Sequence, residues 1–187
     1  MVPTLCRTLG VKGHRPVVGT WDNKHLLYVF ASVNVITSAL HTDTVEGRTG
    51  LYRATGESKT RSLQRAFAAH LRRLGKRYPA AKHPRVVLLI DNAPWHAGAP
   101  VRQALAEHPH LELKRLPSYS PQLNVIERFW KLLRRRATHN RLFDTLADLK
   151  RSIRASLSYF QTVRRRVQTL IAKCYPRPVN QTPSPGP

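Results

Sequence analysis

Two carboxylates in this sequence occupy positions where acidic side chains can do chemistry. Asp91 directly follows the apolar run Val86–Ile90, and Glu127 opens a segment with helical periodicity that begins after Asn124. Functional groups of α/β proteins gather at the carboxyl ends of strands, which favours a catalytic or metal-binding role for Asp91. The sequence Asp91-Asn92-Ala93-Pro94 also suits a β-turn with Asp in its first position. The local sequence leaves both interpretations open.

Glu127 has a structural interpretation of its own. Asn124 and Glu127 have the spacing of a capping box, in which the two side chains satisfy backbone N–H groups at a helix start. Glu127 can also pair with Lys131 one turn later. By itself this pattern favours a structural carboxylate. The cations that follow favour a Mg²⁺ site beside a phosphodiester, because Mg²⁺ takes one or two carboxylates together with phosphate oxygens.

The charge of the chain indicates a polyanionic partner. Lys and Arg number 32 and Asp and Glu number 10, a net charge of +22 over 187 residues. The basic residues lie within helical patterns along most of the chain, and nucleic acid is the common polyanion of a cell. A solvated basic surface is the alternative. The residues expected to hold DNA phosphates follow Glu127 on the same helix and just beyond it: Lys131, Arg134, Arg135, Arg136, His139, Asn140 and Arg141.

Composition excludes several classes of protein. Hydrophobic residues make up 41% of the chain, which is enough for a core and excludes a largely disordered or fibrous protein. The two cysteines, Cys6 and Cys174, form neither a disulfide framework nor a CxxC zinc motif. The longest uncharged apolar-rich stretch, residues 26–40, is shorter than the roughly 20 residues of a membrane span. We therefore expect a cytoplasmic protein with no membrane partner.

Hydrophobic periodicity predicts the elements that position these residues. Strands are predicted at residues 26–33 and 35–41, paired as a hairpin around Asn34, and at residues 86–90 and 111–116. Helices are predicted at residues 59–76, 100–107, 124–137, 144–156 and 159–173, with a loop at 42–58.

Together these elements predict an α/β domain with a small mixed sheet. The five consecutive aliphatic residues of Val86–Ile90 are typical of a central strand that is buried on both faces. This strand is expected between the strand at 111–116 and the hairpin. Asp91 and Glu127 should then lie side by side, with their carboxylates within the roughly 4–8 Å that two-metal chemistry allows.

Two motifs resemble those of mariner-like insertion-sequence transposases of the DDE superfamily. Residues 86–96, VVLLIDNAPWH, resemble the second-aspartate motif of that family. Residues 116–130, LPSYSPQLNVIERFW, resemble its glutamate motif. The 35 residues between Asp91 and Glu127 are close to the short spacing typical of the family, and a weaker likeness runs from about residue 3 to residue 175.

The resemblance implies an RNase H-like fold and a DDE triad that binds two Mg²⁺ or Mn²⁺ ions. It implies cleavage of transposon-end DNA and transfer of the 3′-OH to target DNA, in a bacterial, nucleoid-associated protein that acts on double-stranded DNA, with a homodimer as one assembly. The resemblance also implies that Asp91 and Glu127 are the catalytic and metal-binding residues. It implies that Asn92, His96 and Asn124 are neighbours of the site.

The first aspartate of the family's triad has no clear counterpart in this sequence. In the family it precedes a Gly-rich segment like residues 11–16, and none of the ten residues before that segment is acidic. Asp22 lies on the other side of the segment and has the pattern of a hairpin turn, so we leave it out of the site. The resemblance thus predicts a catalytic-domain fragment without its first strand, which holds one metal ion instead of two and is inactive alone.

The resemblance also predicts the domain organisation. Residues 1–140 are expected to form the DDE-type catalytic domain, truncated at its start, followed by a helical C-terminal extension at 141–175 and a disordered Pro-rich tail at 176–187. Two other functions stay open: a non-catalytic basic nucleic-acid-binding protein, and an RNase H-like nuclease.

Overall fold

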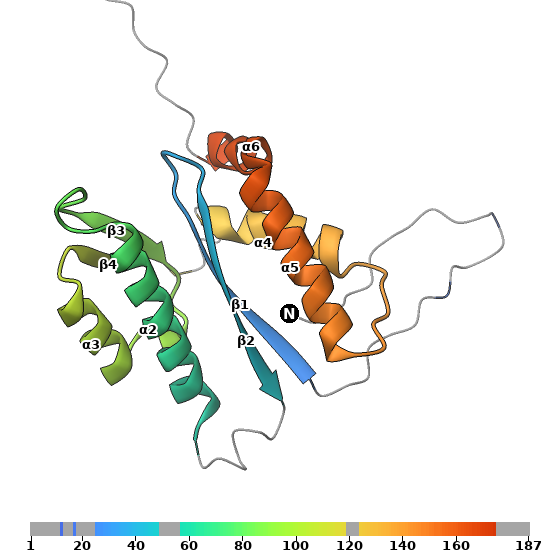
Figure 1. Ribbon diagram of the computed structural model, residues 1–187, viewed down its shortest axis with the longest axis horizontal. Helices are drawn as coiled ribbons and strands as arrows, with labels where there is room; N and C mark the ends of the chain where they lie inside the picture. The colour runs from blue at the N-terminus through green and yellow to red at the C-terminus, as the bar shows by residue number, and fades with distance from the viewer. Residues whose placement is uncertain (1–11, 13–16, 18–24, 49–56, 119–123, 175–187) are drawn as a thin grey trace, which may run out of the picture.

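An antiparallel hairpin of β1 (His25–Val33) and β2 (Leu40–Arg48) runs through the middle of the molecule (Figure 1). The computed structural model describes residues 12, 17, 25–48, 57–118 and 124–174. Between the strands, the Asn34 carboxamide oxygen accepts hydrogen bonds from the backbone N–H groups of Ile36 and Thr37, each at 2.9 Å. Ser38 follows in the left-handed region with φ 59°. These contacts close a turn over residues 34–39, and β2 begins only after it.

The predicted second strand at 35–41 and the predicted loop at 42–48 are therefore wrong. The β-branched residues Val35 and Ile36 lie in the turn, where they are 49% and 85% exposed. Residues 42–48, which contain Gly47, pair along β1, and Thr42 lies opposite Ala31. Residues 49–56 of the predicted loop lie outside the described residues.

A second, parallel sheet consists of β3 (Val86–Ile90) and β4 (Leu111–Arg115). The connection between them contains the short helix η1 (Pro94–His96) and α3 (Ala99–Glu107). The long helix α2 (Lys59–Arg77), capped by the Ser58 hydroxyl, packs on the same side as α3. Buried residues of α2, α3 and the two strands form what we call the parallel-strand core: Phe67, Ala68, Leu71, Ile90, Val101, Ala104 and Leu111.

The two sheets are not joined by hydrogen bonds. Within the described residues β1 pairs only with β2, and β3 only with β4. The expectation of one mixed sheet, in which β3 pairs with both β4 and the hairpin, is therefore wrong, and so is the expected burial of β3 on both faces. Alternate side chains of a strand point to opposite faces, and α2 and α3 cover only the face with Leu88 and Ile90. Val87 and Leu89, on the other face, are 45% and 48% exposed.

Three helices cover the opposite side of the hairpin: α4 (Val125–Ala137), α5 (Leu146–Thr162) and α6 (Arg164–Cys174) (Figure 1). The predicted helix boundary near residue 157 is wrong, because Leu157 and Phe160 continue the apolar stripe of α5 and the break falls at Val163. We call the cluster of these helices and the hairpin the hairpin core. Its buried residues are Leu27, Leu40, Val125, Phe129, Leu133, Ala137, Leu149, Ile153, Leu157, Phe160, Val167 and Ile171.

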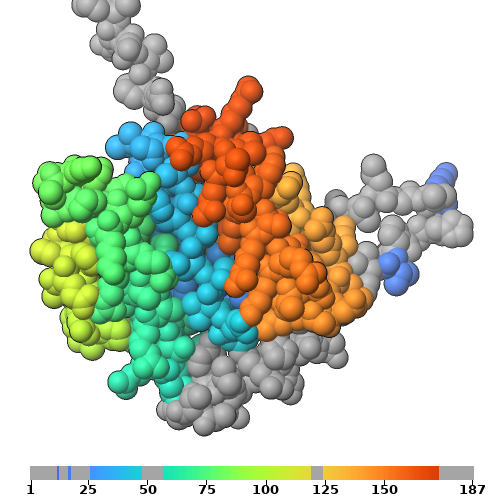
Figure 2. Space-filling model, in the orientation of Figure 1, coloured from blue at the N-terminus to red at the C-terminus, as the bar shows by residue number. Residues whose placement is uncertain are grey.

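β1 contributes to both cores. Leu27, Val29 and Val33 pack in or against the hairpin core, whereas Phe30 packs against the parallel-strand core. Figure 2 shows the hairpin as a blue band between the green surface of α2 and β3 and the orange surface of α4 and α5. The middle layer is thus made of two small sheets with helices on either side. No helix in the described part of the chain is long and apolar enough to cross a membrane.

Candidate active site

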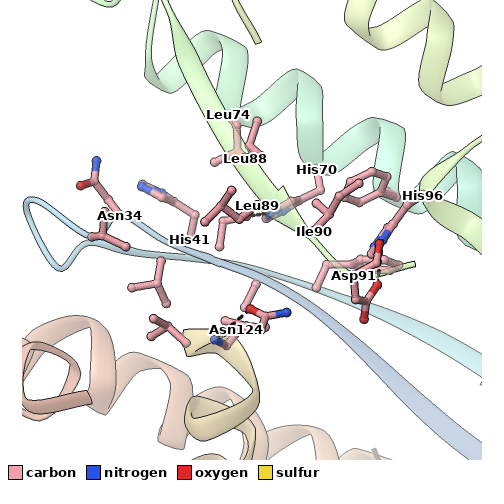
Figure 3. A pocket seen from close by; sticks show the side chains of 18 of the residues that line it. Asn34, His41, His70, Leu74, Leu88, Leu89, Ile90, Asp91, His96 and Asn124 are labelled. Atoms are coloured by element: carbon pink, nitrogen blue, oxygen red, sulfur yellow. Dashed lines mark hydrogen bonds and ion pairs between the residues drawn. The ribbon is translucent and has the colours of Figure 1, made fainter. Parts of the chain in front are cut away.

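A groove of about 590 Å³ lies between β1 and β3. Residues 28–33 of β1 and all of β3 line it, together with side chains of α2 and the first and later turns of α4. Figure 3 shows it from close by, with Asn34 and Asp91 at opposite ends. Asp91, Glu127, His96 and Asn124, four of the residues expected at the site, all line this groove.

Asp91 stands at the carboxyl end of β3 with its side chain 51% exposed. Its Oδ1 accepts a hydrogen bond from the backbone N–H of Ala93 at 3.0 Å, so the carboxylate does close the predicted turn. Oδ1 also lies 3.0 Å from Nδ1 of His96. Oδ2 has no partner among the described residues. The turn interpretation and the site interpretation are therefore compatible, because each uses a different oxygen.

His96 lies beside Asp91 and is mostly buried. Its Nδ1 faces two acceptors, Oδ1 and the backbone carbonyl of Asp91, the latter at 3.3 Å, which indicates that Nδ1 carries the ring proton. The ring also packs on Phe67, with 4.4 Å between centroids. Burial lowers the pKa of His96, and the contacts with Asp91 oppose that shift without cancelling it. A neutral His96 thus holds the Asp91 carboxylate in place.

Asn92 does not line the groove. Its amide donates to the carbonyl of Leu116 at 3.1 Å, and its oxygen accepts a long hydrogen bond of 3.5 Å from Arg115. These contacts tie the end of β3 to the end of β4. Asn92 therefore helps to position Asp91 by holding the ends of the two strands together.

Asn124 caps α4, as the sequence predicts. Its side-chain oxygen accepts a hydrogen bond from the backbone N–H of Ile126 at 3.3 Å. The other half of the capping box is not formed, and neither is the pair with Lys131: within the part of the chain described here, the Glu127 carboxylate makes no hydrogen bond and no ion pair. Glu127, in the first turn of α4, therefore lines the groove with a carboxylate that has no partner among the described residues.

The cations of α4 divide into two sets. Lys131, Arg134 and Arg135 follow Glu127 by four, seven and eight residues, which places them on the same side of the helix. All three are exposed, and none forms an ion pair with another described residue. Arg136 lies on the far side of the helix, where its guanidinium stacks 3.7 Å from the ring centroid of Tyr159.

The remaining predicted DNA-binding residues follow the end of α4. His139 and Asn140 are half-buried, and Asn140 has a left-handed backbone with φ 52°. Arg141 is exposed and donates a weak hydrogen bond to Ser152 at 3.4 Å. The structure thus aligns Lys131, Arg134 and Arg135 with Glu127, but it does not bring the whole predicted set onto one face.

Among the described residues, two carboxylates line this groove and could bind a metal ion. Among those residues no group of three or more His, Cys, Asp or Glu side chains could hold a metal. Carboxylate oxygens are the ligands that Mg²⁺ and Mn²⁺ prefer, and Mg²⁺ needs only one or two of them. Asp91 and Glu127 are therefore possible ligands for a divalent ion, and the described residues do not supply a set of ligands for two ions. Asp22 lies outside the described residues.

Sequence reasoning missed a buried polar network between α2 and the hairpin. His70 Nε2 lies 2.8 Å from Oγ of Ser32, and its Nδ1 contacts Oδ2 of Asp43. Arg73 binds the other oxygen of Asp43 at 2.8 Å. Burial raises the pKa of Asp43, but the hydrogen bonds from His70 and Arg73 outweigh it and the pKa is lowered overall.

This network has the connectivity of a hydrolase triad, but Arg73 compensates the charge of Asp43. We assign the network to holding α2 on the hairpin. The signal in the sequence was His70 itself, a polar residue within the apolar stripe of a helix.

Comparison with known proteins assigns the family. The model of the DDE superfamily endonuclease family matches residues 12–150. The chain belongs to this family. The match includes both Asp91 and Glu127, and it covers the hairpin, both parallel strands and α4.

Relatives of known sequence are similar over part of their length. The chain is 31% identical over 99 residues to the 39 kDa protein of insertion element IS630 from Shigella sonnei, an alignment that covers 53% of this chain and 27% of that protein. It is 32% identical over 84 residues to the Sinorhizobium fredii protein y4pE/y4sA, which covers 45% of this chain and 58% of that one. The aligned part of this chain therefore spans less than two thirds of either relative.

Solved structures confirm the fold class. The Mos1 mariner paired-end complex with Mn has a TM-score of 0.62 at 18% identity over 93% of this chain and 48% of that chain. The Mos1 transposase paired-end complex with left transposon end has a TM-score of 0.56 at 17% identity, over 92% of this chain and 50% of that one. The predicted α/β, RNase H-like architecture is confirmed, and this chain spans about half the length of the Mos1 chains.

Proposed function

We propose that this chain is the catalytic domain of a DDE transposase, which acts on double-stranded DNA at transposon ends and at the target by metal-assisted phosphoryl transfer. One observation carries the proposal: Asp91 and Glu127, with 35 residues between them, line one groove in a domain of the DDE endonuclease family. Neither carboxylate is neutralised by Lys or Arg among the described residues. A protein of net charge +22 has little other reason to leave two carboxylates in a groove without cationic partners.

Asp91 and Glu127 are the residues that would hold a divalent ion, Mg²⁺ or Mn²⁺. When bound, such an ion polarises a phosphodiester and makes water or a 3′-OH a better nucleophile. His96 keeps Oδ1 of Asp91 occupied and leaves Oδ2 for the ion. Lys131, Arg134 and Arg135 extend from the same side of α4 as Glu127, and in this proposal they neutralise phosphates of the bound DNA. His139, Asn140 and Arg141 extend this contact beyond the helix end.

The polypeptide of 187 residues is expected to bind one ion and to cleave DNA poorly or not at all. In-line transfer uses a second ion to stabilise the leaving oxygen, and the described residues supply ligands for one. The same observation favours a second candidate function, a basic DNA-binding protein without catalysis. Metal binding separates the two, because only the transposase site requires it.

The decisive experiment is a titration with Mn²⁺, followed by its paramagnetic resonance and by calorimetry. We expect one ion to bind, with binding lost in Asp91→Ala and in Glu127→Ala. Asp144→Ala is the matched control, because Asp144 is an exposed carboxylate outside the groove. Binding that survives both groove substitutions would refute the site and leave the non-catalytic function.

DNA binding is tested separately by its dependence on salt. The logarithm of the affinity for duplex DNA should fall with the logarithm of the salt concentration by about 0.9 for each phosphate neutralised. Lys131→Ala and Arg135→Ala should each reduce that slope by about one. Arg136→Ala is the control, since its guanidinium already stacks on Tyr159. An affinity that does not change between 50 and 200 mM salt would contradict the proposal.

Cleavage and strand-transfer assays with Mg²⁺ or Mn²⁺ complete the test. A nuclease cuts DNA but does not join a 3′-OH end to a second duplex, whereas a transposase does both. We expect neither product from this polypeptide alone. Metal-dependent cleavage that disappears in Asp22→Ala would show that Asp22 supplies a third carboxylate. Sedimentation of the DNA complex would show whether a homodimer binds it.

A further inference from the structure

An apolar turn is exposed at one end of the molecule. Residues 34–39 join β1 to β2, and in this turn Val35 and Ile36 are 49% and 85% exposed. Turns favour Gly, Asn, Asp, Pro and Ser, so two adjacent β-branched residues here go against the local preference. Neither residue belongs to the hairpin core or the parallel-strand core. The fold therefore does not need apolar side chains at these two positions.

Hydrogen bonds fasten this turn to the rest of the molecule. The backbone N–H of Asn34 donates to the carbonyl of Ala39, and the N–H of Ser38 donates to the carbonyl of Asn34, each at 2.8 Å. The Asn34 amide also donates to the Tyr78 hydroxyl at 3.2 Å, which ties the turn to the end of α2. The exposed Ile36 is therefore held on a preorganised backbone, which lowers the entropy lost when such a side chain binds a partner.

Three consecutive arginines lie at the same end of the molecule. The last turn of α5 is fastened to the start of β2, because the Gln161 amide donates to the carbonyl of Leu40 at 3.4 Å. Arg164, Arg165 and Arg166, in α6, follow that contact within five residues. Figures 1 and 2 both show α6 beside the turn of the hairpin. We call Val35, Ile36 and these three arginines the turn-end surface.

The arginines of the turn-end surface lack a carboxylate partner in the described part of the chain, and all three are exposed. Three arginines elsewhere are each neutralised by a glutamate: Arg65 by Glu57, Arg72 by Glu107 and Arg85 by Glu112. Adjacent guanidinium groups repel one another, so an anion bound from outside would stabilise them. A second copy of the chain is a poor partner, because it would bring its own net charge of +22.

We propose that the turn-end surface binds duplex DNA separately from the groove. Arg164, Arg165 and Arg166 bind phosphates, and Ile36 enters between two base pairs as an apolar wedge. Proteins that bend DNA use isoleucine and similar side chains in this way, and added backbone contacts offset the cost of unstacking the bases. The inference rests on the proposed function only in taking DNA as the partner.

The turn-end surface lies away from the candidate active site. Asn34, which begins the turn, and Asp91 are at opposite ends of the groove (Figure 3). The surface also shares no residue with the cations of α4 that follow Glu127. Substitutions at well-separated sites without common partners have additive effects. Losses of DNA affinity at the turn end and at α4 should therefore add.

Salt dependence tests the arginines, with the whole 187-residue chain and no metal ion. Replacement of all three arginines of α6 by glutamine should lower the slope of log affinity against log salt by about three, at about 0.9 for each phosphate. The matched control carries Arg65→Gln, Arg72→Gln and Arg85→Gln, which change the net charge equally but remove cations that are already paired. This control should lower the slope by less than about one.

Base unstacking tests the wedge. A duplex with 2-aminopurine at its pyrimidine–purine steps, which are the most easily kinked, reports unstacking as a rise in fluorescence. We expect the fluorescence to rise at least about twofold when the chain binds. Ile36→Ser should abolish the rise, and Ile36→Leu should retain it. Leu142→Ser is the matched control, because Leu142 is apolar and 54% exposed but lies outside the turn-end surface. Circular dichroism confirms that each variant folds.

Three results would overturn the turn-end surface. The first is a salt slope that falls equally in the α6 variant and in its control. The second is fluorescence that does not rise when the chain binds, or that still rises in Ile36→Ser. The third is dimerisation of the free chain that Ile36→Ser abolishes, because a second copy would then cover the turn.

The outcomes separate this proposal from the proposed function. A slope that falls in Lys131→Ala and Arg135→Ala but not in the α6 variant refutes the turn-end surface and leaves the proposed function intact. A slope that falls only in the α6 variant supports the turn-end surface and contradicts the DNA contacts proposed for α4. Loss of Mn²⁺ binding in Asp91→Ala tests the catalytic site alone, because the turn-end experiments contain no metal ion.

Discussion

The hairpin core and the parallel-strand core each contain an apolar strand, β1 and β3, but cover it to different degrees. In the hairpin core, Leu27 of β1 and Phe129 of α4 are 1% and 0% exposed. On β3, which supplies Ile90 to the parallel-strand core, Val87 and Leu89 remain about half exposed although every residue of that strand is aliphatic. The difference shows that β3 carries apolar surface beyond what its own core uses. That surplus faces the groove.

Two aspartate–histidine pairs show the same contrast at the level of single residues. Asp43 contacts His70, whose side chain is 3% exposed, and the pair fastens α2 to the hairpin. Asp91 contacts His96, but the carboxylate is half exposed and one oxygen has no partner in the described residues. The first pair is completed by Arg73. The second pair leaves one oxygen of Asp91 available to bind a metal ion, which is why only the second pair suits a metal site.

The largest effect is expected from breaking the hairpin core at its centre. Phe129 is fully buried and packs edge-to-face on Phe160 with 5.4 Å between ring centroids. Phe129→Ala should lower the free energy of unfolding by about 3–5 kcal/mol, because it removes a buried ring and leaves a cavity. Urea denaturation followed by circular dichroism measures the loss. A cost below about 1 kcal/mol would contradict the view that this core is the better packed one.

Removal of Asp43 should be the next largest change. Asp43→Ala leaves the buried His70 and the Arg73 guanidinium without their acceptor, and we expect a cost of about 1–3 kcal/mol in the free energy of unfolding. Asp91→Ala, the comparison variant, should change that free energy by no more than about 0.5 kcal/mol, because Asp91 is exposed. Equal losses in the free energy of unfolding for the two variants would contradict the structural difference between the two aspartate–histidine pairs.

Adjacent leucines on β3 sharpen the comparison within one strand. Leu88 packs against the parallel-strand core, whereas Leu89 is 48% exposed on the opposite face. Leu88→Ala should cost about 2 kcal/mol and Leu89→Ala less than about 1 kcal/mol in thermal or urea unfolding. If Leu89→Ala costs as much as Leu88→Ala, the second face of β3 is covered.

The smallest effect is a dependence of stability on pH. Burial is the main cause that lowers the pKa of His41 and of His96 below the ordinary value of 6.5. The unfolded chain therefore binds more protons than the folded one just below pH 6.5, so stability is present above that pH and declines as the pH falls. The lowered pKa of Asp43 adds a further loss in more acidic solution, below about pH 4.

Melting temperatures measured between pH 7.5 and pH 5 would show this decline. His96→Asn should make it shallower, because one of the two responsible groups is removed. His139→Asn, outside both cores, should leave the curve unchanged. A melting temperature that rises on acidification would contradict the assignment.

The elements with strong local signals were predictable from sequence. Asn124 is a good N-cap and the apolar period after it is clear, so α4 and the place of Glu127 on it follow from local chemistry. β3 and the position of Asp91 at its end follow in the same way. Local signals failed where they compete: Val35 and Ile36 have high strand propensity, but the Asn34 side chain binds the backbone ahead of it and fixes a turn there.

The groove itself could not be predicted from local sequence. A run of five aliphatics indicates how much apolar surface a strand has, but not which neighbours will cover it. The buried network of Ser32, His70 and Asp43 likewise joins three elements that lie far apart along the chain. Such contacts depend on which faces of distant elements meet in the folded protein. Local sequence patterns do not specify these long-range pairings.

The alternation of β1 between the two cores has a consequence for how the molecule tolerates change. Successive side chains of a strand point to opposite faces, so one inserted or deleted residue exchanges the two sets. In β1 this would turn Ser32 toward the helices of the hairpin core and an apolar neighbour toward His70. Length variation should therefore be rejected in β1 and accepted in the turn at 34–39. It also means that neither core can melt while the other keeps its full set of contacts, so the two should be lost in a single cooperative transition.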